Sequence, residues 1–192
     1  MPKVFNIMQY LTHPVTGEQL ITEEQIKSLL EHTTIKEYAY ILHDKDVFDD
    51  EDEIEHIETL KIAYKKLPVE EQNEITIDKY IEDNMWKKSG MLKPPHYHIV
   101  LKTERNTEID TIARWLGIQP QYINIPHKRR GESKEGKLMF WDCVIYLTHE
   151  SEKEQAAGKY RYDDSEVICS FNFREEVNKI LQENLFKYIQ DN

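Results

Sequence analysis

Long hydrophobic runs, a signal peptide and paired cysteines are all missing from this sequence of 192 residues. No stretch approaches the roughly 18 to 20 consecutive apolar residues that span a bilayer. The N-terminal segment MPKVFNIMQYL lacks the charged start, apolar run and small-residue cleavage site of a secretory signal. Cys143 and Cys169 are the only cysteines, too few for a disulfide framework or for a zinc site built on cysteine pairs. We therefore expect a cytoplasmic protein that does not associate with a membrane.

Glycine-rich phosphate loops and an excess of basic charge are also absent. The net charge of −11 at first argues against a nucleic-acid partner, because phosphate binding normally leaves a basic footprint. The charge is uneven, however. Of the 36 acidic and 25 basic residues, 13 and 4 lie between Val47 and Met85, which leaves 23 and 21 elsewhere. The acidity belongs mainly to one segment, and the remaining surface can still present a basic face to DNA.

The order of predicted elements is that of a split βαβ fold. Runs of β-forming residues predict strands, and apolar stripes at helical spacing predict helices. The predicted strands are Val4–Leu11, Glu37–Leu42, the run inside Lys93–Lys102 and Gln121–Ile125, and predicted helices follow Thr22 and Asn106 or Thr107. This order predicts an α+β, ferredoxin-like (RRM-like) fold with a central antiparallel sheet, helices on one face and the other face free for a metal site. The length suggests one domain, residues 1–192.

Two further segments extend this core. Residues 47–90 interrupt the pattern with an acidic segment whose apolar spacing predicts helices, and we interpret it as a helical insertion. Its acidity suits a merely solvated surface, a partner, or the exclusion of non-target nucleic acid. Residues 173–190 predict a C-terminal amphipathic helix. Met139–His149 is rich in apolar and aromatic residues and fits either a strand or a helix.

Two polar motifs suggest a metal site. In KPPHYHIVLK, His96 and His98 project from the same face of a strand, which supplies half of a divalent-metal site. The alternative is a half-buried strand with two incidental histidines. In HDKD, His43 and Asp46 stand where a strand becomes a loop, although Asp also favours simple polar turns. If the two strands pair, neighbouring backbones lie about 5 Å apart, and His43 or Asp46 can join the two histidines around one ion.

Basic and aromatic residues suggest contacts with nucleic acid. Lys128, Arg129 and Arg130 lie in a loop suited to phosphate contacts or simply to solvation. Lys159 and Arg161 belong to KYRYDD, a patch suited to stacking on bases or to a packed edge. If Met139–His149 is a helix, its spacing places Asp142, Tyr146 and His149 on one face.

Taken together, these motifs resemble those of the HUH endonucleases, and more narrowly the RepB-type initiators of plasmid rolling-circle replication. The matching segments are ILHDKD (Ile41–Asp46), KPPHYHIV (Lys93–Val100) and YLTHES (Tyr146–Ser151), in this order. The likeness extends from the first strand to about Phe173. The acidic insertion is not part of the family pattern. A downstream oligomerisation region is not evident either, which suggests a catalytic domain cut from a longer protein.

The resemblance implies a reaction and a set of residues. It makes His43, Asp46, His96 and His98 ligands of Mn²⁺ or Mg²⁺, and Tyr146 the nucleophile. Attack on a single DNA strand at a plasmid origin would leave a 5′-phosphotyrosine link and a free 3′ hydroxyl that primes replication. His149 or Asp142 could assist proton transfer.

The implied partners are origin DNA, with double-stranded repeats and a single-stranded or hairpin nick site, and host replication proteins such as a helicase and a polymerase. Three alternatives remain open at this point. They are a relaxase or single-tyrosine transposase, an origin-binding module without catalysis, and a metal hydrolase of small phosphoesters.

Overall fold

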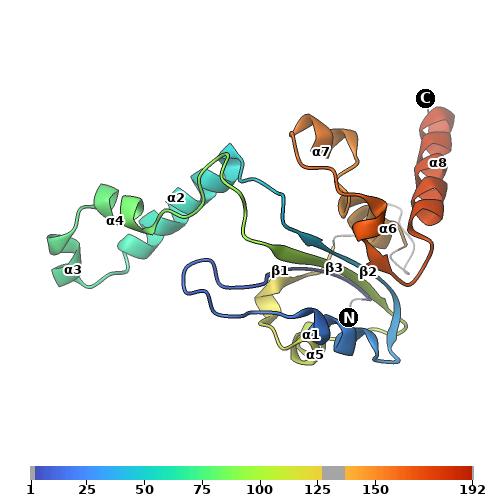
Figure 1. Ribbon diagram of the computed structural model, residues 1–192, viewed down its shortest axis with the longest axis horizontal. Coiled ribbons are helices and arrows are strands. Elements are labelled where there is room, and N and C mark those ends of the chain that lie inside the picture. Colours follow the sequence, from blue (N-terminus) through green and yellow to red (C-terminus); the bar gives the residue numbers. More distant parts are fainter. Residues whose placement is uncertain (1–2, 127–136, 192) are drawn as a thin grey trace.

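The centre of the protein is a twisted antiparallel sheet, seen in a computed structural model that describes residues 3–126 and 137–191 (Figure 1). The strands are β1 (Val4–Tyr10), β2 (Ile35–His43), β3 (His96–Thr103), β4 (Ile123–Asn124) and β5 (Ile168–Cys169). They lie in the order β4-β1-β3-β2-β5, and every pairing is antiparallel. The first four strands have the arrangement of a split βαβ sheet. The predicted α+β fold is therefore confirmed, with β5 as an additional edge strand that the sequence did not predict.

Helices α1 (Glu23–Leu30) and α5 (Ile109–Leu116) pack on one face of this sheet. Thr22 and Gln25 form a capping box at the start of α1, where the sequence predicts a helix after Thr22, and Gly117 ends α5 with a left-handed φ of 74°. Both helices bury aliphatic side chains against the strand residues that point to the same side. That side of the core includes Phe5, Ile7, Ile26, Leu29, Ile99, Leu101, Ile112 and Leu116.

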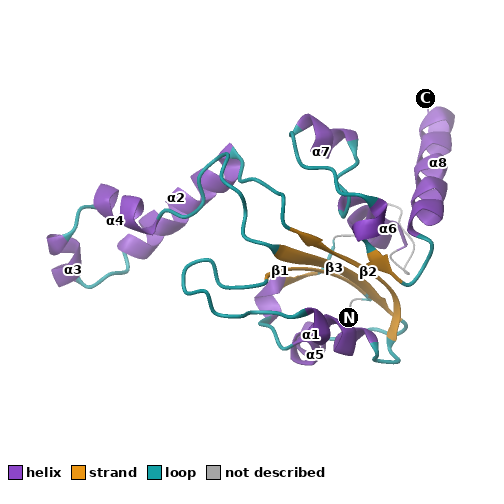
Figure 2. Cartoon of the chain, in the orientation of Figure 1, coloured by secondary structure: helices purple, strands orange, loops and turns teal. Residues whose placement is uncertain are grey.

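The opposite face is covered in part by α6 (Lys137–Tyr146) and α8 (Phe173–Asp191) (Figure 2). The expectation that this face is free is therefore wrong for part of its area. The reason is that the strands also carry apolar residues on this side, and these residues need cover. The buried cluster on this side includes Val4, Ala39, Ile41, Val100, Phe140, Val144, Leu147 and Val177. The end of β2 and the start of β3 carry histidines instead.

The predicted helical insertion at residues 47–90 is present and forms an arm that extends away from the sheet (Figure 1). It consists of α2 (Asp50–Tyr64), α3 (Val69–Glu74) and α4 (Ile77–Asn84). Backbone hydrogen bonds close the two ends of the arm against each other, from Phe48 N–H to the Met91 carbonyl at 2.9 Å and from Lys93 N–H to the Asp46 carbonyl at 2.7 Å. The arm therefore leaves the core as a continuation of the β2–β3 pair.

Aromatic packing and one ion pair hold the root of this arm. Trp86 lies edge-on to Tyr10 and Phe48, with ring centroids 6.2 and 5.8 Å apart. Lys93 Nζ lies 2.6 Å from a carboxylate oxygen of Asp52 in the first turn of α2. These contacts fix the acidic start of α2 beside the histidine-bearing end of β3.

The chain between α6 and α8 contacts the histidine-bearing end of the sheet. It contains α7 (Glu152–Ala156), a 3₁₀ turn (Asp164–Glu166) and β5, and it leads into α8 at the predicted position, Phe173. Within residues 3–126 and 137–191, no helix has both the length and the apolar character that a bilayer-spanning segment needs.

Candidate metal centre and nucleophile

Strand pairing brings three histidines together. His43 lies directly opposite His96, and Ile41 lies opposite His98, in the β2–β3 register. Residues opposite each other project from the same face, and so do residues two apart in one strand. The ring centroids of His43 lie 5.6 Å from His96 and 4.6 Å from His98, and those of His96 and His98 are 5.1 Å apart. The expected pairing of the two motif-bearing strands is therefore confirmed.

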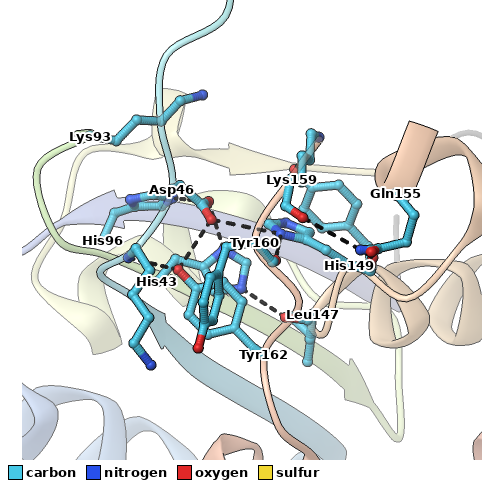
Figure 3. A network of polar contacts seen from close by, with 12 residues as sticks. His43, Asp46, Lys93, His96, Leu147, His149, Gln155, Lys159, Tyr160 and Tyr162 are labelled. Atoms are coloured by element: carbon cyan, nitrogen blue, oxygen red, sulfur yellow. Dashed lines mark hydrogen bonds and ion pairs between the residues drawn. The ribbon is translucent and has the colours of Figure 1, made fainter. Parts of the chain in front are cut away.

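Asp46 completes the group from the loop that follows β2. Its Oδ2 lies 3.2 Å from His43 Nδ1 and 3.6 Å from His96 Nε2, and the residue is 9% exposed. Figure 3 shows this carboxylate in the middle of the surrounding imidazoles. Burial by itself would raise the pKa of Asp46, but contacts with His43 and the other nearby imidazoles outweigh burial and hold that pKa well below its usual range. The carboxylate is therefore ionised at neutral pH.

Backbone carbonyls orient two of these histidines. His43 Nε2 lies 2.7 Å from the Leu147 carbonyl oxygen, and His96 Nδ1 lies 3.0 Å from that of Pro94. A carbonyl oxygen only accepts, so each of these nitrogens carries a hydrogen. In a neutral ring, the lone pairs then belong to His43 Nδ1 and His96 Nε2, which are the nitrogens that face Asp46. Carbonyl partners of this kind commonly fix metal-ligating histidines.

Burial disfavours the charged forms of His96 and His98 and leaves nitrogens of this group without partners. It lowers the pKa of His96 and lowers that of His98 well below the ordinary value. His43 Nδ1 and His98 Nδ1 are buried and make no hydrogen bond, because the approach of His43 to Asp46 lacks hydrogen-bond geometry. Buried nitrogens without partners are costly, and a bound cation or an ordered water would satisfy them.

The donor atoms fit a metal ion. One nitrogen from each of His43, His96 and His98 lies within 4.8 Å of the others, so this buried group can hold a metal ion. A second group, formed by His43, Asp46 and His149, meets the same criterion and shares His43 with the first. The four predicted ligands thus lie together, and their joint use around one ion stays a prediction.

Tyr146 lies beside this centre, as the last residue of α6. The segment that fitted either a strand or a helix is thus helical up to this residue. The Tyr146 ring centroid is 5.4 Å from that of His98, and Lys159 Nζ donates a hydrogen bond to Tyr146 Oη at 3.3 Å. Tyr146, Asp46, Lys93 and Lys159 line a cavity of about 50 Å³. The predicted nucleophile and a predicted ligand therefore line the same cavity.

His149 lies at the site, but it is carried by the turn after α6 and not by the helix itself. The expected shared helical face is wrong for this residue, because α6 ends at Tyr146 and His149 adopts a left-handed φ of 53°. Its ring centroid is nevertheless 4.8 Å from that of Tyr146. Its Nδ1–H donates to the Tyr160 carbonyl at 3.0 Å, and its Nε2 is buried without a hydrogen-bond partner. Burial lowers the pKa of His149 to about 4.

Two site residues were missed by sequence reasoning. Tyr162 is 2% exposed, and its hydroxyl donates to Asp46 Oδ1 at 3.1 Å, whereas the sequence assigned it only to a basic and aromatic patch. No local signal separates Tyr162 from Tyr160, because residues two apart in an extended segment project from the same side. Lys93, which lines the cavity, was noted only as part of its motif.

The residues predicted to bind DNA differ in where they lie in the structure. Lys128, Arg129 and Arg130 lie outside the described residues. Lys159 is half-buried beside Tyr146, so it belongs to the candidate site. Arg161 points to solvent, and its nearest carboxylate oxygen, on Glu150, lies 3.5 Å away. A DNA contact for any of them stays a prediction.

Comparison with known proteins gives one informative match. No family model matches the chain. Over 175 residues the chain is 26% identical to a protein of Onion yellows phytoplasma (strain OY-M) named "Replication protein". The match covers 90% of this chain but only 35% of that protein, so the chain spans about a third of the length of the relative.

Proposed function

We propose that this protein nicks and rejoins single-stranded DNA at a plasmid origin, in a metal-dependent reaction that initiates rolling-circle replication. The observation that carries the proposal is the position of Tyr146, whose ring lies against His98 and which shares a cavity with Asp46. A tyrosine at a buried histidine and carboxylate centre suits phosphoryl transfer to a phenol oxygen better than hydrolysis by water alone. The name of the phytoplasma relative, "Replication protein", supports the same process.

The centre would use His43, Asp46, His96 and His98 to hold Mn²⁺ or Mg²⁺. Three imidazoles and a carboxylate favour Mn²⁺, because Mg²⁺ prefers ligand sets dominated by oxygen. Such an ion supplies Lewis acidity, which polarises the scissile phosphate and offsets the charge that develops on it. The buried nitrogens His43 Nδ1 and His98 Nδ1 make no hydrogen bond, which supports the assignment of these histidines as ligands.

The residues of the chain account for the remaining chemistry. A phenol is a weak nucleophile near neutral pH because the pKa of tyrosine is about 10. The Lys159 ammonium, which donates to Tyr146 Oη, stabilises the negative charge that forms on this oxygen when the phenol loses its proton. Attack on phosphorus forms the bond to Tyr146, the bond to the 3′ oxygen breaks, and that oxygen takes up a proton. The products are a 5′-phosphotyrosine link and a 3′ hydroxyl.

These products explain why such a reaction serves replication. The free 3′ hydroxyl can prime a host polymerase, and a host helicase can separate the strands from the nick. The covalent link conserves the energy of the broken phosphodiester for later rejoining. Plasmid origin DNA and these host proteins are therefore the proposed partners.

The test is cleavage of DNA from the protein's own genetic surroundings. Single-stranded fragments that span the gene and its flanks are incubated with the protein and Mn²⁺, and nicks are mapped on denaturing gels. We expect one preferred nick that disappears in Tyr146→Phe and in EDTA but persists in Tyr122→Phe, a matched control at an exposed position. Binding of one fragment without any nick would instead favour an origin-binding module. Cleavage that survives Tyr146→Phe would favour hydrolysis.

A further inference from the structure

Tyr162 packs against His43 of the candidate metal centre. Its ring stacks on His43 with a centroid distance of 4.2 Å and an interplanar angle of 5°. Its backbone N–H donates to the Thr148 carbonyl at 3.1 Å. The stacking thus places the Tyr162 ring against His43, and the backbone hydrogen bond ties this residue to the turn that follows α6.

The Tyr162 hydroxyl has a defined hydrogen-bond direction. It accepts from the Lys45 backbone N–H at 2.9 Å and lies 3.1 Å from Asp46 Oδ1. An ionised carboxylate only accepts, so the hydroxyl hydrogen goes to Oδ1. This leaves the other oxygen, Oδ2, as the one that faces His43 Nδ1 and His96 Nε2. The two oxygens of Asp46 thus have separate partners, as Figure 3 shows.

We propose that Tyr162 is a positioning residue of the metal centre, which restricts Asp46 to binding an ion through Oδ2 alone and holds the His43 ring in its binding orientation. The inference deepens the proposed function and rests on its metal centre. A carboxylate ligand can bind through one oxygen or two. With Oδ1 accepting the hydrogen bond from Tyr162, Oδ2 is the oxygen that would bind an ion.

One chain segment then fixes both halves of the site. Residues 146–162 carry the proposed nucleophile Tyr146, the Leu147 carbonyl that orients His43, and the Tyr162 hydroxyl that orients Asp46. Strands β2 and β3 supply the ligands, and this segment sets their directions. The position of Tyr146 relative to His43 and Asp46 is therefore set by this one segment, which contacts both residues.

Metal titration without DNA tests the inference. Mn²⁺ alone is titrated calorimetrically into the wild type, Tyr162→Phe and Tyr160→Phe. Tyr162→Phe removes one hydroxyl and keeps the stacked ring, and Tyr160→Phe makes the same change at an exposed neighbour. We expect Tyr162→Phe to raise the Kd for Mn²⁺ about tenfold, in line with the loss of an outer-shell hydrogen bond to a ligand, and Tyr160→Phe to leave it unchanged. Near-UV circular dichroism checks that each protein is folded.

The Co²⁺ spectrum gives a readout that a merely structural role would not move. In Tyr162→Phe, the freed Asp46 can bind through both oxygens, which raises the coordination number, and the visible Co²⁺ absorption should then weaken relative to the wild type. In an Asp46→Ala background, Tyr162→Phe should have no further effect on the Kd for Mn²⁺, because the tyrosine acts through Asp46. The comparison of Asp46→Ala with the double variant keeps the inference testable if Tyr162→Phe alone folds less completely.

Two results would overturn the inference. One is an unchanged Kd together with an unchanged Co²⁺ spectrum in Tyr162→Phe, with Mn²⁺ bound normally by the wild type. The other is a wild type that binds neither ion, which removes the centre on which the inference rests. Because the titration contains no DNA, its result is independent of whether the protein nicks DNA.

Discussion

Replacing Lys159 with methionine should slow the proposed attack by Tyr146 without removing the metal centre. The ammonium lies 3.3 Å from Tyr146 Oη and 4.9 Å from the centroid of the tyrosine ring. Burial lowers the pKa of Lys159, but Tyr146 and the nearby carboxylates outweigh burial and raise it overall, so the side chain is cationic at neutral pH. Methionine keeps the length and apolar stem of the side chain and removes only its charge and hydrogen bond.

The expected loss follows from the energy of this one contact. A hydrogen bond to a charged group is worth about 1.5 to 3 kcal/mol. Lys159 is only half-buried, so the lower part of that range applies, and each 1.4 kcal/mol corresponds to about a tenfold change in rate. We therefore expect the rate of covalent adduct formation to fall about 10- to 30-fold in Lys159→Met. Lys159→Arg should recover part of this loss, because it restores a cation.

The assay measures formation of the covalent adduct in a single turnover, with Mn²⁺ and an intact oligonucleotide that contains the nick site. The adduct is followed on denaturing gels. Lys153→Met is the matched control, since Lys153 is exposed and lines the same wider cleft of about 530 Å³ as Tyr146 and Lys159. Its rate should stay close to that of the wild type. Equal rates in Lys159→Met and the wild type would refute the reasoning, as would an equal loss in both methionine variants.

Three further predictions concern stability. Because burial lowers the pKa of His149 from 6.5 to about 4, the unfolded chain binds a proton in this range that the folded chain does not. The free energy of unfolding should therefore fall by about 3 kcal/mol between pH 7 and pH 4, measured by urea titration in EDTA, and His149→Gln should flatten the profile. Mn²⁺ at a hundred times its Kd should stabilise the protein by about 2.7 kcal/mol and raise Tm by about 5 to 11 °C. Calorimetry should show a much smaller shift in Tm for Asp46→Asn. Gly117→Ala should lower the free energy of unfolding by at least about 1 kcal/mol, because φ is 74° and the added Cβ would lie 2.9 Å from Gln25 Nε2. Gly158→Ala should lower it by less, because φ is 72° but the space around the added Cβ is open. Equal urea midpoints for the two alanine variants would contradict this last account.

The main strands could be predicted because local patterns determine them, whereas the pairing of the two motif-bearing strands was only a condition until the structure showed it. Alternation in KPPHYHIVLK fixes which face His96 and His98 share. Helix limits were less accurate where capping is weak. Helix α5 begins after Glu108, not after Asn106 or Thr107, and Glu108 makes no side-chain cap hydrogen bond. The short helix α3 and the two-residue strand β5 carry too few residues for a periodic signal.

The outer part of the site could not be predicted because it depends on contacts between distant residues. Tyr162 and Asp46 are 116 positions apart, and nothing in either motif indicates that their side chains meet. His149 was noticed in its motif, but its approach to Tyr146 follows from the turn after α6, where the backbone adopts a positive φ. The cover provided by α6 and α8 was missed for a similar reason, since periodicity does not tell which sheet face a helix will choose.

The most direct test of the central claim is to identify the residue that becomes linked to DNA. The protein is incubated with Mn²⁺ and a random-sequence single-stranded DNA library, the covalent fraction is recovered under denaturing conditions, and its peptides are analysed by mass spectrometry. We predict a nucleotide adduct on the peptide that contains Tyr146, absent in EDTA and strongly reduced in His96→Ala. An adduct on another residue, or recovery of cleaved DNA with no adduct on any peptide, would contradict the account.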